Sequence, residues 1–523
     1  MPAAPLPQSP ANDKDTARAA GRGGIAVLGA KAFFILSGLL QQTLLPRVIG
    51  LAGFGALSRV LAVANVVNNV VVASATQGVS RAVARAHEHH REALRAGLRV
   101  HLIAALGAAA LFALASPLVA GFEGASYIAL PLLVMAGVVA CYGVYAAFVG
   151  ALNGTKRFSQ QAALDVTFAV LRTVGILGLG WLFVRRGQSG VVGATLGFVL
   201  AAACIVPLAA RWTGLGKKAP GPLPDVPSAP EYVKGLVPVA IAQLFTNAVM
   251  QIDITLLGHF LSASGASVEA SKQADVWIGV YRACQLFAFL PYQLLFSVTQ
   301  ILFPLVATAH AGGNAAEVKQ YVARGARIGA IACGLMVAVI VAMPGSLLAF
   351  AFPAEIAERG ASTLRILALG QGAFAMMGLA ATVLVSLGRE RDAALITLAA
   401  LILVGIGCFG AVPWQPFGGA QLVVTAIATS VALAVGLGLA AARVTQVAGA
   451  FIPVKTAARV AVGVALALVA GFRLPSVGKL LTPIEAAGIG VLFVGILAGL
   501  GELGSEDLAL VTALVRRRGG AKA

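Results

Sequence analysis

Charged side chains interrupt several of the long apolar stretches of this sequence, and cations outnumber anions among them. They are Lys31, Arg59, Arg172, Arg282, Asp165 and Asp253. A charge near the middle of an apolar helix costs about 2.5–3.5 kcal/mol on membrane-insertion scales, so such residues usually face a cavity or a partner. Arginine binds phosphate through paired hydrogen bonds from its planar fork. The excess of cations therefore predicts a cavity for an anionic substrate, such as a phosphate or pyrophosphate group.

The elements that carry these charges are predicted to be membrane-spanning helices. Of the 523 residues, 59% are hydrophobic and only 11% are charged, whereas soluble proteins carry about 25% charged residues. One crossing needs about 20 apolar residues, and fourteen such segments follow one another between residues 24 and 503. The sequence thus predicts an all-α polytopic membrane protein with about fourteen transmembrane helices.

The positions of the Lys and Arg residues predict the orientation of these helices. Most of the 38 Lys and Arg residues fall in segments that are cytoplasmic if the N-terminus is inside, as the positive-inside rule requires. Both termini are therefore expected in the cytoplasm. The formal net charge of +18 follows from this topology, so we expect no nucleic-acid partner.

The segments are predicted to form two six-helix lobes followed by two further helices. The stretch "RWTGLGKKAPGPLPDVPSAPEYVKG", rich in Pro and Gly, separates the sixth segment from the seventh and is typical of a linker. A shift of 223 residues places "ATQGVSRAVARAH" over "VTQILFPLVATAH" and Arg59 over Arg282, which indicates an internal repeat. The predicted parts are a disordered cytoplasmic tail (1–23), an N-lobe (24–210), a cytoplasmic linker (211–235), a C-lobe (236–442), two helices with an interfacial segment (443–503) and a cytoplasmic tail (504–523).

Each of the two repeat-related arginines begins a polar stripe along its predicted helix. At 100° per residue, Gln77 lies on the same helical face as Arg59, and Gln300 lies on the same face as Arg282. We predict that these side chains line a cationic cavity together with two cations of other helices. The predicted substrate-binding residues are Arg59, Arg282, Arg172, Lys31, Gln77 and Gln300.

Less specific interpretations of these charges stay open. Arg59, Arg282 and Lys31 could each extend a long side chain to the membrane interface. Asp165 and Arg172 lie seven residues apart and could simply neutralise each other within one helix. The sequence does not decide between these roles and a cavity.

The two carboxylates at membrane depth, Asp165 and Asp253, are the candidate carriers of a coupling ion. We expect no cofactor other than a proton or sodium ion in that role. No G-x-x-x-x-G-K-[ST] nucleotide-binding motif occurs, and we find no catalytic constellation. "HEHH" (87–90) lies in a basic loop without further ligands and is predicted to be a solvated surface. We therefore expect neither an enzyme nor a metal site.

Two stretches resemble a known superfamily of membrane transporters. "VYRACQLFAFLPYQLLFSVTQILFPLVATAHAGGN" (280–314) resembles the eighth helix of the flippases in the multidrug/oligosaccharidyl-lipid/polysaccharide (MOP) exporter superfamily. The glycines of "IGLAGFGAL", followed by "GVSRAVARA" (78–86), resemble the first hairpin of its polysaccharide flippases. The resemblance covers about residues 24–440 and implies a V-shaped, MATE-like pair of lobes that alternate access to a central cavity.

The same resemblance implies a flippase of the bacterial plasma (inner) membrane. It would move an undecaprenyl-pyrophosphate-linked oligosaccharide from the cytoplasmic to the periplasmic leaflet. The implied partners are this lipid-linked anionic oligosaccharide, membrane lipids, and the polysaccharide polymerase and glycosyltransferases of the same pathway.

The resemblance also bears on the substrate. Lipid II flippases of the superfamily have several Arg residues in their first two helices, where this chain has Lys31 and Arg59. That difference favours a polysaccharide repeat unit over lipid II. The alternatives are a lipid II flippase, a cation-coupled multidrug exporter of the same fold, and a polytopic membrane glycosyltransferase or polymerase.

Overall fold

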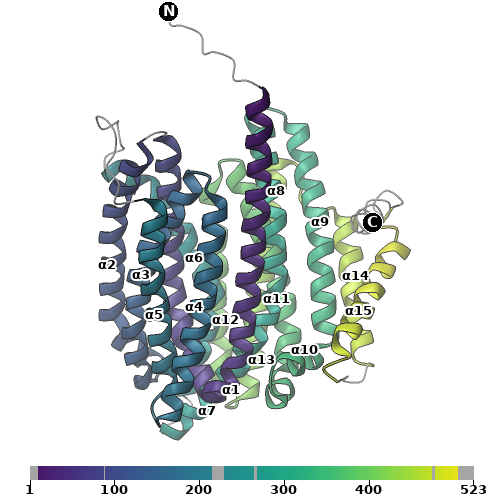
Figure 1. Ribbon diagram of the computed structural model, residues 1–523. Helices are drawn as coiled ribbons and strands as arrows, with labels where there is room; N and C mark the ends of the chain where they lie inside the picture. Colours follow the sequence, from purple (N-terminus) through teal and green to yellow (C-terminus); the bar gives the residue numbers. More distant parts are fainter. Residues whose placement is uncertain (1–9, 87–88, 215–228, 264–267, 474–477, 505–523) are drawn as a thin grey trace, which may run out of the picture. The chain divides into compact units, whose positions relative to one another are not determined.

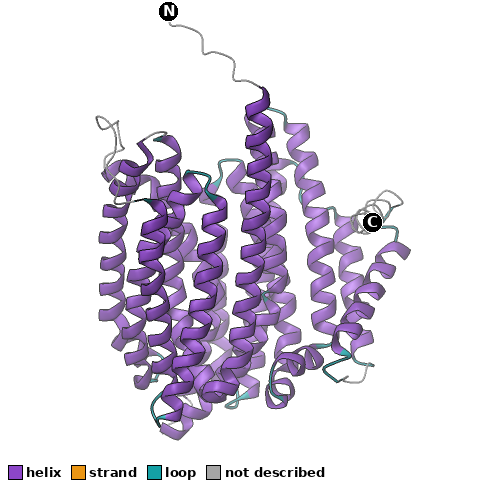
Figure 2. Cartoon of the chain, viewed as in Figure 1, coloured by secondary structure: helices purple, strands orange, loops and turns teal. Residues whose placement is uncertain are grey.

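The computed structural model describes residues 10–86, 89–214, 229–263, 268–473 and 478–504, and every regular element in these ranges is a helix (Figure 2). Within the same ranges, thirteen helical stretches are long and apolar enough to cross a membrane. The predicted all-α polytopic membrane fold is confirmed. The α-helices, labelled in Figure 1, are α1 (Pro10–Arg85), α2 (His90–Phe122), α3 (Ala129–Gly154), α4 (Phe158–Arg185), α5 (Gly190–Thr213), α6 (Ala229–Ala263), α7 (Val268–Ala288), α8 (Leu290–Ala311), α9 (Ala315–Ala342), α10 (Pro344–Ala351), α11 (Ala354–Ser386), α12 (Glu390–Ala411), α13 (Gly419–Ala448), α14 (Val454–Gly471) and α15 (Thr482–Gly499). Two short 3-10 helices are η2 (Ser126–Ile128) and η3 (Val412–Trp414).

Helix α1 contains the first two predicted membrane segments, which are separated by a break at Gly50. This residue has φ 78° and ψ 164°, a conformation that only glycine adopts at little cost. The break divides α1 into a first arm (10–49) and a second arm (51–85), so each of the fourteen predicted segments has a helical counterpart. Helix α1 begins at Pro10, inside the predicted tail (1–23), whose first nine residues lie outside the described ranges.

Prolines divide two of the helices that the sequence predicted to be continuous. The predicted helix 276–306 is two helices, α7 and α8, because Pro291 stands at the start of α8 and has no N–H to continue the α7 ladder. Similarly, α9 ends at Ala342, Met343 is non-helical with φ −129° and ψ 48°, and Pro344 begins the short helix α10. The polar stripe predicted along 276–306 is therefore shared between two helices.

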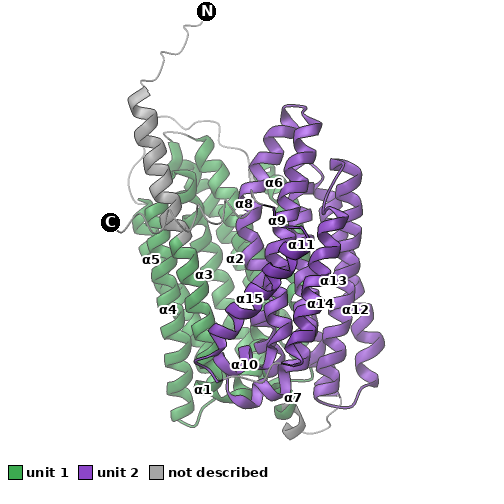
Figure 3. Cartoon of the chain, turned by 90° about the vertical axis from the view of Figure 1, so that its right-hand side faces the viewer, with its two compact units in different colours: residues 1–251, 265–279 green, residues 252–264, 280–523 purple. Residues whose placement is uncertain are grey.

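The chain divides by packing into two compact units (Figure 3). Unit 1 comprises the residues up to Gln251 together with Gly265–Gly279, and unit 2 comprises Ile252–Ser264 and the chain from Val280 onward. The division falls within α6 and α7 rather than at the predicted linker 211–235, of which residues 215–228 lie outside the described ranges. The predicted lobe boundaries and the V-shaped arrangement of the lobes stay predictions.

Small residues allow close helix packing inside each unit. In unit 1, α4 and α5 cross at Gly175 and Gly197, where a Cβ on either residue would overlap the backbone of the other. In unit 2, α14 and α15 pack on α9, and the buried ring of Phe493 fills the space left by Gly334 and Gly463. Such contacts are typical of helix association in membranes, where small residues let backbones approach.

Candidate functional site

Arg59 is at the centre of a buried charged cluster in unit 1. Its side chain has no exposed surface, and its Nε lies 2.9 Å from Oδ1 of Asp275 in α7. Its Nη1 donates a 3.0 Å hydrogen bond to the main-chain oxygen of Glu123 and lies 3.6 Å from Oε2 of the same residue. The hydroxyl of Tyr127 donates a 2.5 Å hydrogen bond to Oδ2 of Asp275. We call these four residues the Arg59 cluster.

The Arg59 cluster contains one cation and two carboxylates, and this imbalance acts on Glu123. Burial raises the pKa of Glu123 from its ordinary 4.5 to about 7; the charge of Arg59 opposes the increase, and that of Asp275 adds to it. Both carboxylate oxygens of Glu123 are buried and accept no hydrogen bond from the described residues. Glu123 therefore takes up a proton near neutral pH. Substrate contact by Arg59 stays a prediction, and in this structure its charge is opposed within the protein.

Arg172 lies near the middle of α4, between α1 and α3. Its guanidinium carbon is 4.5 Å from the centre of the Phe34 ring, a cation–π geometry, and it is hydrogen-bonded with Tyr142. Gly38 makes room for it, since a Cβ at that position would lie 3.3 Å from Nη2 of Arg172. Its Nε is buried and has no hydrogen-bond partner among the described residues. Arg172 thus keeps a donor available inside unit 1.

Asp165 interacts with α1 and α3 rather than with Arg172. The hydroxyl of Tyr145 donates a 3.4 Å hydrogen bond to its Oδ1, and Lys31 is close enough for its charge to act on the carboxylate. Asp165 and Arg172 are separated by seven residues of α4, about 10 Å along the helix axis. Lys31 and Asp165 therefore lie close together in the structure. Arg172 instead contacts the aromatic side chains of Phe34 and Tyr142.

Arg282 belongs to a second buried cluster, in unit 2. Its Nη1 donates a 3.1 Å hydrogen bond to Oε1 of Gln285, whose Nε2 donates at 2.9 Å to Oδ1 of Asp253. The hydroxyl of Tyr281 donates at 2.8 Å to Oδ2 of Asp253, which is 1% exposed. The Nε of Arg282 is buried without a partner among the described residues. We call Arg282, Gln285, Asp253 and Tyr281 the Arg282 cluster.

The two predicted stripe glutamines lie far from their arginines. Gln77 follows Arg59, and Gln300 follows Arg282, by 18 residues, which is about 27 Å at 1.5 Å per residue. The first stripe lies along the second arm of α1, whereas the second is divided between α7 and α8. In both, the arginine and the glutamine are too far apart to contact one phosphate. Gln77 is half-buried on the second arm of α1, whereas Gln300 is exposed on α8.

Gln300 lines a groove of about 320 Å³ between α8 and α11, both in unit 2. The groove lies along about 16 Å of α8, from Tyr292 to Phe303, at 1.5 Å per residue. Its walls combine aromatic, hydroxyl and amide groups. The lining residues are Tyr292, Leu295, Phe296, Thr299, Gln300, Phe303, Ala375, Gly378, Leu379 and Thr382.

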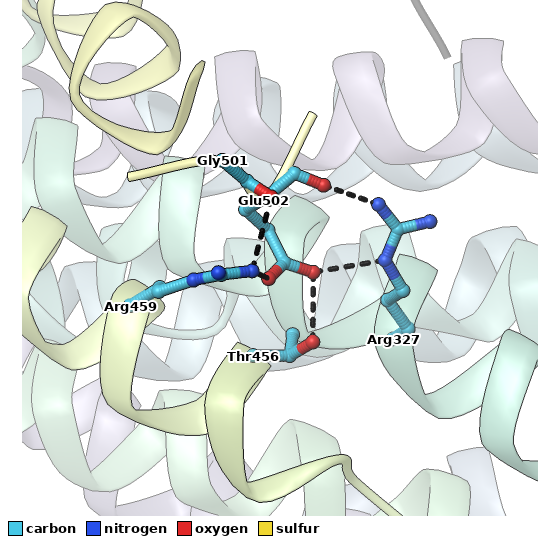
Figure 4. Close-up of polar contacts among 5 residues, drawn as sticks. All are labelled: Arg327, Thr456, Arg459, Gly501 and Glu502. Carbon is cyan, nitrogen blue, oxygen red and sulfur yellow. Dashed lines mark hydrogen bonds and ion pairs between the residues drawn. The ribbon is translucent and has the colours of Figure 1, made fainter. Parts of the chain in front are cut away.

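A third buried charged cluster joins the C-terminal helices of unit 2 (Figure 4). The carboxylate of Glu502 accepts hydrogen bonds from Arg327 Nε at 2.8 Å, Arg459 Nη1 at 2.9 Å and Thr456 Oγ1 at 2.7 Å. Arg459 and Arg327 also donate to the main-chain oxygens of Gly501 and Glu502, respectively. These contacts connect the end of α15 to α9 and α14. We call these five residues the Glu502 cluster.

Sequence reasoning missed Glu123, Asp275 and Glu502 because all three lie at or beyond the ends of apolar segments. Acidic residues at the ends of membrane segments are usually solvated, so they are not expected to form buried ion pairs. A signal for Glu123 and Asp275 was nevertheless present. Arg59 is predicted near one end of its helix, and both acids are predicted at the same membrane level, so matching charges by depth would have paired them.

The described residues contain no group of three His, Cys, Asp or Glu side chains that could hold a metal ion. Of the "HEHH" stretch, His87 and Glu88 lie outside the described ranges.

A comparison with known protein families decides the family. Residues 20–310, more than half of the chain, match the family described as "Polysaccharide biosynthesis protein". The chain belongs to this family. The match includes the whole of the Arg59 and Arg282 clusters and α8 as far as residue 310, so these features lie within the part of the chain that the polysaccharide biosynthesis family shares. A comparison with curated proteins finds no match.

Solved structures share the fold of this family member across most of its length. The lipid II flippase MurJ, in an inward closed conformation, has a TM-score of 0.66 at 14% identity, covering 90% of this chain and 98% of its own. An inward-facing multidrug resistance MATE family transporter of the MOP superfamily has a TM-score of 0.62 at 16% identity, covering 81% and 98%. A MOP superfamily transporter from Pyrococcus furiosus has a TM-score of 0.55 at 16% identity, covering 82% and 96%. The predicted MOP fold is confirmed.

Proposed function

We propose that this protein is a flippase that moves a lipid-linked oligosaccharide of the undecaprenyl-pyrophosphate type from the cytoplasmic to the periplasmic leaflet. The observation that carries the proposal is membership of the polysaccharide biosynthesis family over residues 20–310. The fold supports it, because structures with this fold include a lipid II flippase and MATE transporters. Bacterial inner-membrane localisation, with both termini cytoplasmic, is part of the same proposal.

Within this function, Arg282 in unit 2 and Arg172 in unit 1 are each a candidate ligand for the pyrophosphate. Each has a buried Nε without a protein partner among the described residues, and an unmet guanidinium donor at membrane depth favours an anionic ligand. Arg59 differs, because two carboxylates oppose its charge. We therefore assign Arg59 a structural role.

The mechanism needs no bond to be made or broken, so we expect no enzyme activity. Binding of the pyrophosphate by arginine replaces its hydration inside the membrane. A change in lobe arrangement would then expose the bound lipid to the other leaflet. Asp253 and Asp165 stay the candidate carriers of a coupling proton or sodium ion, and imposing either gradient across vesicles would identify the ion.

The proposal is tested with purified full-length protein in vesicles that contain the lipid-linked repeat unit of the source membrane. Access of an added glycosidase to that lipid measures flipping. Arg282→Gln should reduce affinity about 10- to 150-fold, because a lost hydrogen bond to a charged group costs about 1.5–3 kcal/mol. Arg282→Lys keeps the charge without the planar fork and should be intermediate.

The matched control is Arg359→Gln, which removes an exposed arginine paired with Glu355 in unit 2. It should leave flipping unchanged. Normal flux through correctly inserted Arg282→Gln protein would overturn the assignment of the pyrophosphate to this side chain. Absence of flipping by the unmodified protein, in vesicles where it is correctly folded, would overturn the flippase itself.

Lipid II is the competing substrate within the same mechanism, favoured by the fold shared with MurJ over 98% of that chain. The same vesicles loaded with lipid II distinguish the two. Transport of lipid II in preference to the source repeat unit would replace the proposed substrate. Efflux of a cationic dye without lipid movement would instead support a multidrug exporter.

A further inference from the structure

We propose that the groove between α8 and α11 binds the sugar units of the transported lipid as uncharged pyranose rings. This inference rests on the proposed function and adds a subsite for the part of the substrate that carries no charge. The groove has about 320 Å³ of space, at the lower end of the roughly 300–1,000 Å³ of ligand pockets. Its extended form along α8 suits a short chain of rings rather than a compact molecule.

The aromatic residues of the groove present the surface that a sugar ring recognises. Phe296 and Phe303 are 47% and 41% exposed, and Tyr292 is held in place against Phe374, with ring centres 4.9 Å apart. The face of an aromatic ring carries partial negative charge, and the C–H bonds on one face of a pyranose carry partial positive charge. Such rings therefore bind sugars by stacking and by apolar burial.

Hydrogen-bonding groups accompany these rings along the groove. Neither the side chain of Gln300 nor the hydroxyl of Tyr292 bonds to any of the described residues, and both are available to sugar hydroxyls. Thr299 and Thr382 donate to their own helices, to Phe296 O at 2.7 Å and Gly378 O at 3.0 Å, so their oxygens remain acceptors.

Pro304 supplies one more acceptor at the same place. It lies inside α8 and has no N–H, so the carbonyl of Gln300, four residues earlier, loses its helical donor. A carbonyl and an amide without partners at membrane depth are costly unless they meet water or a polar ligand. Gln300 thus combines a side chain that lines the groove with a backbone oxygen that has lost its helical donor.

The lining residues contain no charged side chain, which separates this groove from the arginines assigned to the pyrophosphate. A prenyl chain is the other apolar part of the substrate, but it makes no hydrogen bonds. It would gain nothing from the threonines, the tyrosine hydroxyl or Gln300. The combination of stacking faces with hydroxyl and amide groups therefore points to the sugar.

The test compares two lipids binding to full-length protein in nanodiscs. One is undecaprenyl pyrophosphate carrying the repeat unit of the source membrane, and the other is undecaprenyl pyrophosphate without sugar. Phe296→Ala, Gln300→Leu and Thr299→Val should each weaken binding of the glycosylated lipid about fivefold or more, the scale of one lost hydrogen bond or stacking contact. Binding of the sugar-free lipid should not change.

Gln300→Leu distinguishes the two occupants, because it keeps the volume of the side chain and removes its polarity. If a prenyl chain fills the groove, Gln300→Leu should preserve or strengthen binding of both lipids, and Phe296→Ala should weaken both equally. That pattern would overturn the sugar subsite. Phe350→Ala is the matched control, since Phe350 is 48% exposed in unit 2 and lies outside the groove.

Different experimental results would overturn the sugar subsite and the proposed function. Unmodified protein that flips the glycosylated lipid, with groove variants equal to Phe350→Ala, would overturn the subsite alone. Unmodified protein that neither binds nor flips the glycosylated lipid would overturn the function, and the subsite with it.

Discussion

The Arg59 cluster of unit 1 and the Glu502 cluster of unit 2 are both buried charged groups, but their ratios of cations to anions are reversed. Arg59 alone faces the carboxylates of Glu123 and Asp275, whereas Glu502 alone faces Arg327 and Arg459. Glu123 and Glu502 are almost equally inaccessible, 0% and 4% exposed. Both side chains are inaccessible, but the arginines around Glu502 are partly exposed to water and Arg59 is not, so the surroundings and the partners both distinguish the two glutamates.

The pKa values of the two glutamates lie on opposite sides of the ordinary value of 4.5. Burial raises the pKa of Glu123 to about 7; the charge of Arg59 opposes the increase, and that of Asp275 adds to it. Burial also acts to raise the pKa of Glu502, but the hydrogen bonds from Arg459, Arg327 and Thr456 outweigh it and lower the pKa below its ordinary 4.5. The comparison teaches that low exposure of a side chain does not by itself decide the protonation of a carboxyl group; the hydrogen bonds and charges around it act as well.

Arg59→Gln should give the largest effect. It leaves two buried carboxylates without their cation, and removal of one partner from a buried ion pair costs about 3–5 kcal/mol. We expect a much lower apparent melting temperature in detergent and less folded protein in the membrane, measured by fluorescence-detected size-exclusion chromatography. Adding Asp275→Asn to this variant should recover part of the loss, because one uncompensated charge is removed.

The control for Arg59→Gln is Arg359→Gln, whose ion pair with Glu355 is exposed and worth about 0–1 kcal/mol. If Arg59→Gln melted at the same temperature as this control, Arg59 would not be a structural cation. That result would favour the prediction that Arg59 binds the substrate.

Glu502→Gln should have a smaller but clear effect. The amide keeps the shape of the side chain but loses the charge that Arg327 and Arg459 share, at a cost of about 1.5–3 kcal/mol for hydrogen bonds to charged groups. Because the two arginines are 29% and 32% exposed, water can solvate them after the change. Apparent melting temperature should fall less than in Arg59→Gln, and a larger fall would reverse the order that the comparison predicts.

The sequence predicted the helical fold well because membrane segments are defined by composition and length alone. The fourteen apolar segments and the MOP fold follow from local hydrophobicity and from a few Gly and Pro patterns. Helix ends near Pro291 and Pro344 were less predictable. An apolar run continues through each of these residues, and only backbone geometry reveals the break.

The candidate site was harder to predict because a periodic pattern locates a face of a helix and not a partner. The repeat placed Arg59 and Arg282 at equivalent positions, yet one faces two carboxylates and the other reaches Asp253 only through Gln285. Helical periodicity also aligned Gln300 with Arg282, although 18 residues separate them. Partners come from other helices, and no single-helix pattern contains that information.

The smallest effect, and the most direct test of the comparison, is the pH dependence of stability. Between pH 4.5 and 7, folded protein holds a proton on Glu123 that unfolded protein releases, so this group makes stability fall as pH rises through that window. Glu502 acts in the opposite sense. The contribution of Glu502 to stability is complete above pH 4.5. It is lost as the pH falls below 4.5 and passes through the lower pKa that Glu502 has in the folded protein. Melting curves from pH 4 to 8 should show that Glu123→Gln flattens the slope of stability against pH between pH 4.5 and 7, whereas Glu502→Gln changes it only below pH 4.5.

Glu355→Gln, at an exposed glutamate, is the control and should alter neither window. If Glu123→Gln retained the full slope between pH 4.5 and 7, the raised pKa of Glu123 would not be the cause of that slope, and the contrast between the two clusters would fail.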